Sequence, residues 1–104
     1  MEQSYYFGLV ALDSILGICI VAKNAGLPVE PDGMVGYRVI DPLTGAVLAT
    51  GALQPLPDPI IGVRFGQITV AKAVQFAPQH NYAILFSYTV NAIEKSIEGY
   101  FTVD

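Results

Sequence analysis

The side chains best suited to nucleophilic or general-base chemistry at neutral pH are Cys19 and His80, each the only residue of its type in the chain. Cys19 lies in the apolar run 18–21, which predicts a buried thiol that packs as a small hydrophobe. A catalytic cysteine needs a polarising partner, and His80 is far away along the sequence. His80 itself lies between Gln79 and Asn81 with no triad partner or nucleophile elbow beside it, which indicates a surface loop. We therefore predict no catalytic residues and no enzymatic activity.

Acidic side chains are the next candidates, because loop carboxylates can bind hard cations. Glu30, Asp32, Asp41 and Asp58 all fall in predicted loops, and only the first two have a spacing found in calcium loops. Zinc would need several Cys or His ligands, and this chain has one of each. The glycine pair in segment 62–66 lacks the following helix that a phosphate-binding loop requires. The sequence predicts solvated loop carboxylates, no metal and no cofactor.

The charge distribution argues against two classes of partner. Nine acidic and five basic residues give a net charge of −4, and the basic residues are scattered singly. Nucleic acids and anionic membranes both require clustered Lys and Arg, so neither is expected. The apolar stretch 7–22 is interrupted by Asp13 and Ser14 and lacks a preceding positive charge, unlike a signal peptide. We expect the chain to be made in the cytoplasm of its producer.

The composition is unusually apolar for a domain of 104 residues. Hydrophobic residues make up 53% of the chain and charged residues 13%, whereas soluble domains average about 25% charged residues. Large exposed apolar patches are rare on free monomers, which predicts that part of this surface is covered by another chain. The alternative is a monomer whose surface consists of Ala, Gly, Thr, Gln and Asn.

Ten glycines and seven prolines divide the sequence into short segments rich in β-branched and aromatic residues, a pattern typical of sandwiches and barrels. We predict one domain over 1–104, an all-β, seven-stranded immunoglobulin-like Greek-key β-sandwich. The expected strands are 5–12, 15–23, 34–40, 46–53, 62–71, 82–91 and 96–103. Segment 24–33 is expected to be a loop, 72–81 a loop or a single short turn, 41–45 a hairpin connection and 91–95 a turn. The proline-rich segment 54–59 is expected to be extended and unpaired, carrying the chain between sheets.

Alternation in the last two predicted strands assigns residues to the inside and outside of the sandwich. Tyr82, Ile84, Phe86, Tyr88 and Val90 share one face of strand 82–91, and Ile97, Gly99, Phe101 and Val103 are expected to point inward from the final strand. Tyr82 also fits a tyrosine corner, in which the hydroxyl bonds to backbone upstream; the alternative is a core aromatic with its hydroxyl at the rim. Because exposed aromatic residues anchor protein interfaces, the predicted contact residues are Tyr5, Tyr6, Phe7, Leu85 and Tyr100.

Two hairpin motifs resemble those of a group of small immunoglobulin-like proteins. The first joins Gly-Tyr-Arg-Val-Ile-Asp-Pro at 36–42 to Gly-Ala-Val-Leu-Ala-Thr-Gly at 45–51, and the second joins Asn-Tyr-Ala-Ile-Leu-Phe-Ser-Tyr-Thr-Val at 81–90 to Gly-Tyr-Phe-Thr-Val at 99–103. The group is encoded in tailed-phage and prophage structural gene blocks and includes the N-terminal domains of baseplate upper proteins. The resemblance covers about residues 7–103, and the proline-rich segment 55–59 departs from it.

The resemblance implies a virion component, either a capsid decoration or cement protein or a tail or baseplate adaptor. Its partners would be other virion proteins, with the chain present as a homo-oligomer or bound to a lattice. It implies no residue-level functional site. Two other classes stay open. A carbohydrate- or cell-surface-binding module would be a monomer with exposed tyrosines near loop acids, and an enzyme would need a pocket that holds His80 beside a second titratable group.

Overall fold

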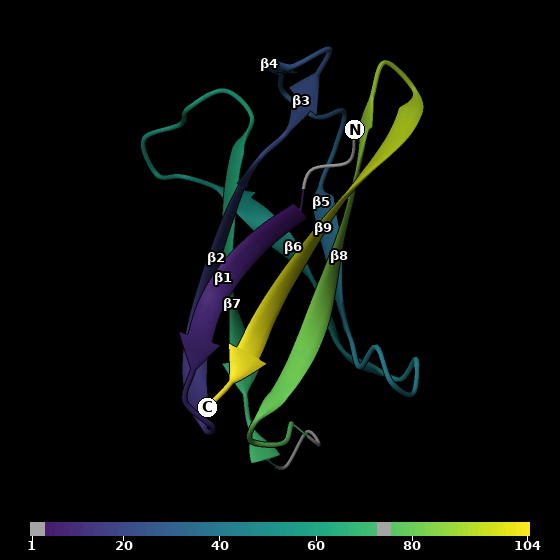
Figure 1. The fold of residues 1–104 in the computed structure, drawn as a ribbon. Coiled ribbons are helices and arrows are strands. Elements are labelled where there is room, and N and C mark those ends of the chain that lie inside the picture. Colours follow the sequence, from purple (N-terminus) through teal and green to yellow (C-terminus); the bar gives the residue numbers. More distant parts are fainter. Residues whose placement is uncertain (1–3, 73–75) are drawn as a thin grey trace.

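The protein is described by a computed structural model that places residues 4–72 and 76–104. It is an all-β protein with nearly no helix, built as a seven-stranded mixed sheet and a small two-stranded ribbon (Figure 1). The order of strands across the large sheet is β1-β9-β8-β5-β6-β7-β2. These strands are β1 (Ser4–Val10), β2 (Ser14–Val21), β5 (Val35–Ile40), β6 (Val47–Pro55), β7 (Val63–Val70), β8 (His80–Val90) and β9 (Ile93–Val103).

Strand β6 changes its pairing partner along its length. Its residues 47–53 pair with β5, and its last two residues, Gln54 and Pro55, pair with Phe65 and Arg64 of β7. The expectation that 54–59 is wholly unpaired was wrong, because Gln54 and Pro55 belong to the β6–β7 ladder, and a crossover between two sheets at this segment stays a prediction. Proline lacks only the N–H donor, so its carbonyl remains able to accept a hydrogen bond. One strand thus joins a part made of β1, β9, β8, β5 and β6 to a part made of β7 and β2.

The turns explain most differences between predicted and observed strand ends. Asn91 and Ala92 both have positive φ, and Val90 pairs with Ile93, so a two-residue turn replaces the predicted turn 91–95. Ala25 and Gly26 likewise form a tight turn within the predicted loop 24–33, between β3 (Lys23–Asn24) and β4 (Leu27–Pro28). The connection 41–45 is the predicted hairpin, with Gly45 at φ 76°. Its Asp41 N–H donates to the Ala46 carbonyl at 2.9 Å.

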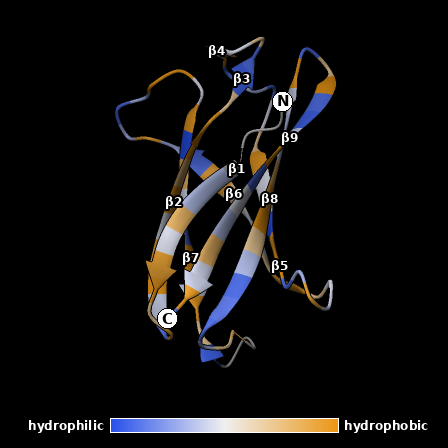
Figure 2. Cartoon of the chain, viewed as in Figure 1, coloured by the Kyte–Doolittle hydropathy of each residue, from blue (hydrophilic) through white to orange (hydrophobic). Residues whose placement is uncertain are grey.

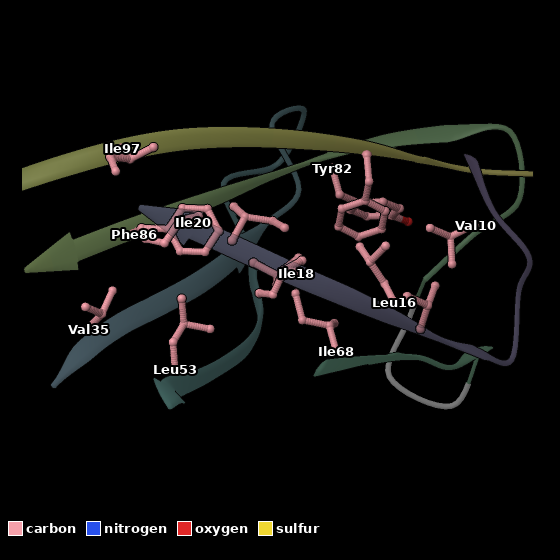
Figure 3. Packing of buried hydrophobic residues seen from close by; sticks show 14 of the residues in the cluster. Val10, Leu16, Ile18, Ile20, Val35, Leu53, Ile68, Tyr82, Phe86 and Ile97 are labelled. Carbon is pink, nitrogen blue, oxygen red and sulfur yellow. The ribbon is translucent and has the colours of Figure 1, made fainter. Parts of the chain in front are cut away.

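Buried side chains from both parts of the sheet form one hydrophobic core (Figure 3). The predicted inward faces of the last two strands are confirmed: Tyr82, Ile84 and Phe86 are at most 1% exposed, and Phe101 and Val103 are fully buried. Opposite them, β2 contributes its alternate residues Leu16, Ile18 and Ile20. Apolar residues are not confined to this core, since Figure 2 also shows them in the loop between β6 and β7, where Ile60 and Ile61 are exposed.

The alternation in β2 overturns the expectation for its cysteine. Because residues 16, 18 and 20 point inward, Ile15, Gly17 and Cys19 point outward, and the Cys19 thiol is exposed. The run of apolar residues on both faces concealed this parity in the sequence. Cys19 therefore does not pack in the core.

Tyr82 makes the hydrogen bond expected of a tyrosine corner. Its hydroxyl accepts the backbone N–H of Ala77, five residues upstream, at 2.8 Å. The ring packs edge-on against Phe76 with centroids 4.9 Å apart and is stacked on Phe101 at 5.5 Å. The side chain combines the two alternatives of the sequence analysis, because it is a core aromatic whose hydroxyl also fixes the preceding loop. Residues 73–75 of the predicted loop 72–81 lie outside the described residues.

Candidate contact surface

Three of the five predicted contact residues lie on one face of the sheet. Tyr6 of β1 is paired in register with Tyr100 of β9, and their side chains are 64% and 36% exposed. Leu85 of β8 is half-buried on the same outward face, because its neighbours Ile84 and Phe86 point into the core. The contact role of these residues stays a prediction, but the fold brings them together.

The pair of tyrosines begins an apolar row that crosses five strands. Tyr100 is opposite Ala83 of β8, Ala83 is opposite Ile40 of β5, and Ile40 is opposite Val47 of β6. Directly opposed residues on neighbouring strands have their side chains on the same face. We call Tyr6, Tyr100, Ala83, Ile40 and Val47 the outer row. It is exposed at both ends, since Val47 is 49% exposed, and it contains no charged side chain.

Polar groups flank the outer row on both sides. On one side, the Tyr6 hydroxyl lies 3.1 Å from Thr102 Oγ1, and Thr102 donates to Asn81 Oδ1 at 2.7 Å. Because the single Thr102 proton is used for Asn81, Tyr6 donates to Thr102. On the other side, Glu98 and Arg38 border the row, with the apolar Leu85 opposed to both of them between their strands. An apolar strip with a polar border is the arrangement found in protein interfaces.

Tyr5 and Phe7, the other two predicted contact residues, point the opposite way. Both are partly buried and pack against the core. The Phe7 ring lies edge-on to Phe86 with centroids 6.1 Å apart and covers Gly99, where an added Cβ would come within 2.5 Å of the ring. Alternation along β1 therefore separates Tyr6 from its two aromatic neighbours, and Tyr5 and Phe7 are not part of the outer row.

Three of the four loop acids, Glu30, Asp32 and Asp41, accept hydrogen bonds and are not simply solvated, which corrects the sequence expectation for these three. Glu30 Oε2 accepts from the buried Arg64 guanidinium at 2.8 Å, and its Oε1 accepts the Gly62 N–H at 2.9 Å. The Arg64 hydrogen bond, followed by that of Gly62, lowers the pKa of Glu30. Asp32 accepts the Ala92 N–H at 3.0 Å. These carboxylates therefore fix loops against the sheet.

His80 also departs from its prediction, because it is the first residue of β8 and is not in a free loop. Its Nε2 lies 3.3 Å from Asp41 Oδ1, and the two side chains are 25% and 18% exposed. Asp41 accepts the Leu43 N–H as well, and this bond is the main cause of its lowered pKa, with His80 adding to it. The surface hollow beside them is lined by Pro42, Leu43, Gln79, His80 and Asn81. That lining offers an imidazole and a carboxylate nearby but no hydroxyl or thiol nucleophile.

Within 4–72 and 76–104, no group of three or more His, Cys, Asp or Glu side chains is arranged to hold a metal ion. In the same ranges, no helix has the length and hydropathy needed to cross a membrane.

Sequence reasoning missed Ile40, Ala83 and Val47 as members of the outer row, in which Val47 is exposed, Ile40 is half-buried and Ala83 is buried at 7% exposure. Their strands were predicted, but nothing in the sequence states which residues of non-adjacent strands are opposed. The register between β5 and β8, which joins residues more than forty positions apart, supplies that information. From the sequence alone, only the alternation along each strand could have indicated which residues point outward.

No protein-family model matches this sequence, and a search of curated proteins finds no relative. The resemblance to phage structural proteins therefore rests on the two hairpin motifs alone.

Proposed function

We propose that this protein is an immunoglobulin-like β-sandwich that binds other proteins without catalysing a reaction, as a structural component of a tailed-phage virion. In that role it would act as a decoration, cement or adaptor protein on the capsid or tail. The observation that carries the proposal is the outer row, an uncharged strip that crosses five strands and is bordered by polar groups.

Strand pairing supports the immunoglobulin-like part of the proposal. In immunoglobulin domains, strands B and E lie in one sheet while C, F and G lie in the other. Here β2 pairs with β7, and β8 lies between β5 and β9. Tyr82 lies near the start of β8, and its hydroxyl accepts the N–H of Ala77 in the preceding segment. A tyrosine corner has the same position in the immunoglobulin fold.

Exposed apolar side chains support the binding part. Among the described residues, Tyr6, Leu9 and Val47 are each at least 49% exposed on the strands that contain or border the outer row. Burying such side chains stabilises a complex by about 25 cal/mol per Å² of apolar surface. When the protein is alone this apolar surface stays in contact with water and the stabilisation is not realised. Exposed apolar surface of this kind is typical of sites that bind another protein.

A photo-crosslinking amino acid in place of Tyr6 or Val47, expressed in the producing cells, tests this proposal. We expect both positions to form a covalent adduct with a virion structural protein, identified by mass spectrometry. The matched control is the same amino acid at Glu94, an exposed β9 residue outside the outer row, which should form no such adduct. If neither outer-row position forms an adduct, the outer row is not the binding surface. If adducts form only with non-virion proteins, the proposed virion role is wrong.

One observation favours a second candidate, a carbohydrate- or cell-surface-binding module. Tyr6 and Tyr100 present neighbouring rings beside the hydroxyl and amide groups of Thr102 and Asn81, and sugars stack on aromatic rings while bonding to such groups. Glycan-array binding that is lost in the variant Tyr6→Ser would favour this alternative.

A further inference from the structure

The strand β2 lies at one end of the seven-stranded sheet and pairs only with β7. Its register with β7 is continuous from Ser14 to Val21, without a bulge. The preceding strand, β1, pairs with β9 in the other part of the sheet. Among the described residues, no backbone partner outside β7 is present for residues 15–21. The other edge of β2 is therefore a row of unpaired peptide groups.

Natural proteins usually protect such an edge with charged residues, proline, a bulge or a short strand. β2 has none of these features, since its eight residues are Ser-Ile-Leu-Gly-Ile-Cys-Ile-Val. Its outward side chains are also apolar or small, with Ile15 61% exposed. An edge with this character is a template for an added strand.

We propose that β2 pairs, antiparallel, with β2 of a second copy of this chain. The charges at its two ends point to this occupant. Asp13 precedes β2 and Lys23 follows it, while the strand between them carries no charge. An antiparallel copy places each Asp13 near the Lys23 of the other chain, and a parallel copy would place like charges together. The chain itself is also the one partner present wherever the protein is made.

Pairing of the charges at the two ends of β2, Asp13 with Lys23, also selects the register of the antiparallel pair. If Asp13 opposes Lys23, then Ile18 lies on the two-fold axis, Leu16 opposes Ile20, and Gly17 opposes Cys19. All inward residues then face inward residues, as a continuous sheet requires. Every opposed pair within the strand is aliphatic or small, which favours cross-strand contact. In the proposed dimer the sheet continues from β7 through both β2 strands to the β7 of the second copy.

This inference concerns a different part of the sheet from the outer row and does not depend on the proposed function. Failure of crosslinking at Tyr6 would leave β2 pairing intact, and a monomeric protein could still bind a virion through the outer row. The two tests therefore fail separately.

The native Cys19 is a reporter for the proposed pairing, because its thiol is exposed on the sheet face. In the proposed register the two Cys19 Cα atoms are about 8 Å apart, from two residues of strand rise and one strand spacing. A nitroxide label on each thiol should give dipolar coupling at less than about 20 Å. A control label on Leu43→Cys in a Cys19→Ser background should give no coupling at that distance, because Leu43 is 80% exposed in a hairpin outside β2.

Two variant pairs test the edge itself in sedimentation experiments. At Gly17 an added Cβ meets nothing within 4 Å, so Gly17→Asn and Gly17→Asp should both fold, and circular dichroism checks this. Only Gly17→Asp places carboxylates close together across the two-fold axis, and we expect its dimer to be about tenfold weaker. Lys23→Glu should weaken dimerisation more than Lys23→Gln, since the Lys23 hydrogen bonds to Tyr88 use only its backbone.

The expected result is a dimer with short label distances that Gly17→Asp weakens and Gly17→Asn retains. A protein that stays monomeric at every concentration would overturn the inference. So would a dimer whose Cys19 labels are far apart, or equal effects of the charged and neutral variants.

Discussion

Replacement of Tyr82 by phenylalanine removes a single oxygen from the core while the ring contacts with Phe76 and Phe101 remain. The lost group is the acceptor for the Ala77 N–H at 2.8 Å, a part-buried bond. A typical intramolecular hydrogen bond contributes about 1 kcal/mol, and a buried donor left without an acceptor costs about 1–3 kcal/mol. Because Ala77 is only partly buried and water can reach part of it, we expect Tyr82→Phe to lower the free energy of unfolding by about 1–2 kcal/mol.

Urea denaturation followed by circular dichroism measures this change, and thermal unfolding should shift by about 4–8 °C per kcal/mol for a domain of this size. The matched control is Tyr6→Phe, which removes an equally bonded but exposed hydroxyl and should change stability by less than about 0.5 kcal/mol. Tyr82→Ala should cost about 3–5 kcal/mol, because the ring is removed as well. Equal stabilities of Tyr82→Phe and Tyr6→Phe would refute the structural role of the corner hydrogen bond.

Two further predictions concern backbone strain and acid sensitivity. Gly62 and Gly45 have similar φ values, 79° and 76°, but an added Cβ would lie 2.7 Å from the Ala22 carbonyl oxygen at Gly62 and would have no atom within 4 Å at Gly45. Gly62→Ala should therefore lower the free energy of unfolding by more than the roughly 1 kcal/mol expected of Gly45→Ala. Equal urea midpoints for the two variants would contradict this prediction. Arg64 and Gly62 hold the pKa of Glu30 below its ordinary value of 4.5, so its stabilising contribution is complete above that value and is lost as the pH falls through the lowered pKa. The difference in melting temperature between the native protein and Glu30→Gln should accordingly be present at neutral pH and shrink below pH 4.5; a difference independent of pH would show that the ion pair is not its source.

Local patterns were sufficient to predict every strand of the large sheet. The alternation from Tyr82 to Val90 fixed which side chains of β8 are buried, because a strand has a period of two whatever its partners are. Gly45 marked the β5–β6 hairpin through the positive φ that its turn requires. Tyr82 marked the corner through its place at the start of a strand.

Long-range and two-sided features could not be predicted in the same way. The apolar run around Cys19 has no visible parity, so the sequence alone indicates a buried thiol where the structure has an exposed one. Asp41 and His80 are far apart in sequence, and their contact depends on how β5 and β8 are placed side by side. The outer row depends likewise on the registers of four strand pairs, of which the sequence specifies only those closed by short turns. The features that sequence analysis does not predict are therefore of two kinds: contacts between strands that are distant along the chain, and the inward parity of a strand that is apolar on both faces.

The pairing of β1 with β9 has a consequence for biosynthesis. Tyr6 leaves the ribosome long before its register partner Tyr100 is translated, and at about 5–20 residues per second the delay is on the order of 5–20 s. During that interval the aromatic N-terminal strand has no partner, and the nascent chain can close its sheet only after β9 emerges. A factor that shields hydrophobic nascent segments would therefore find its target in β1.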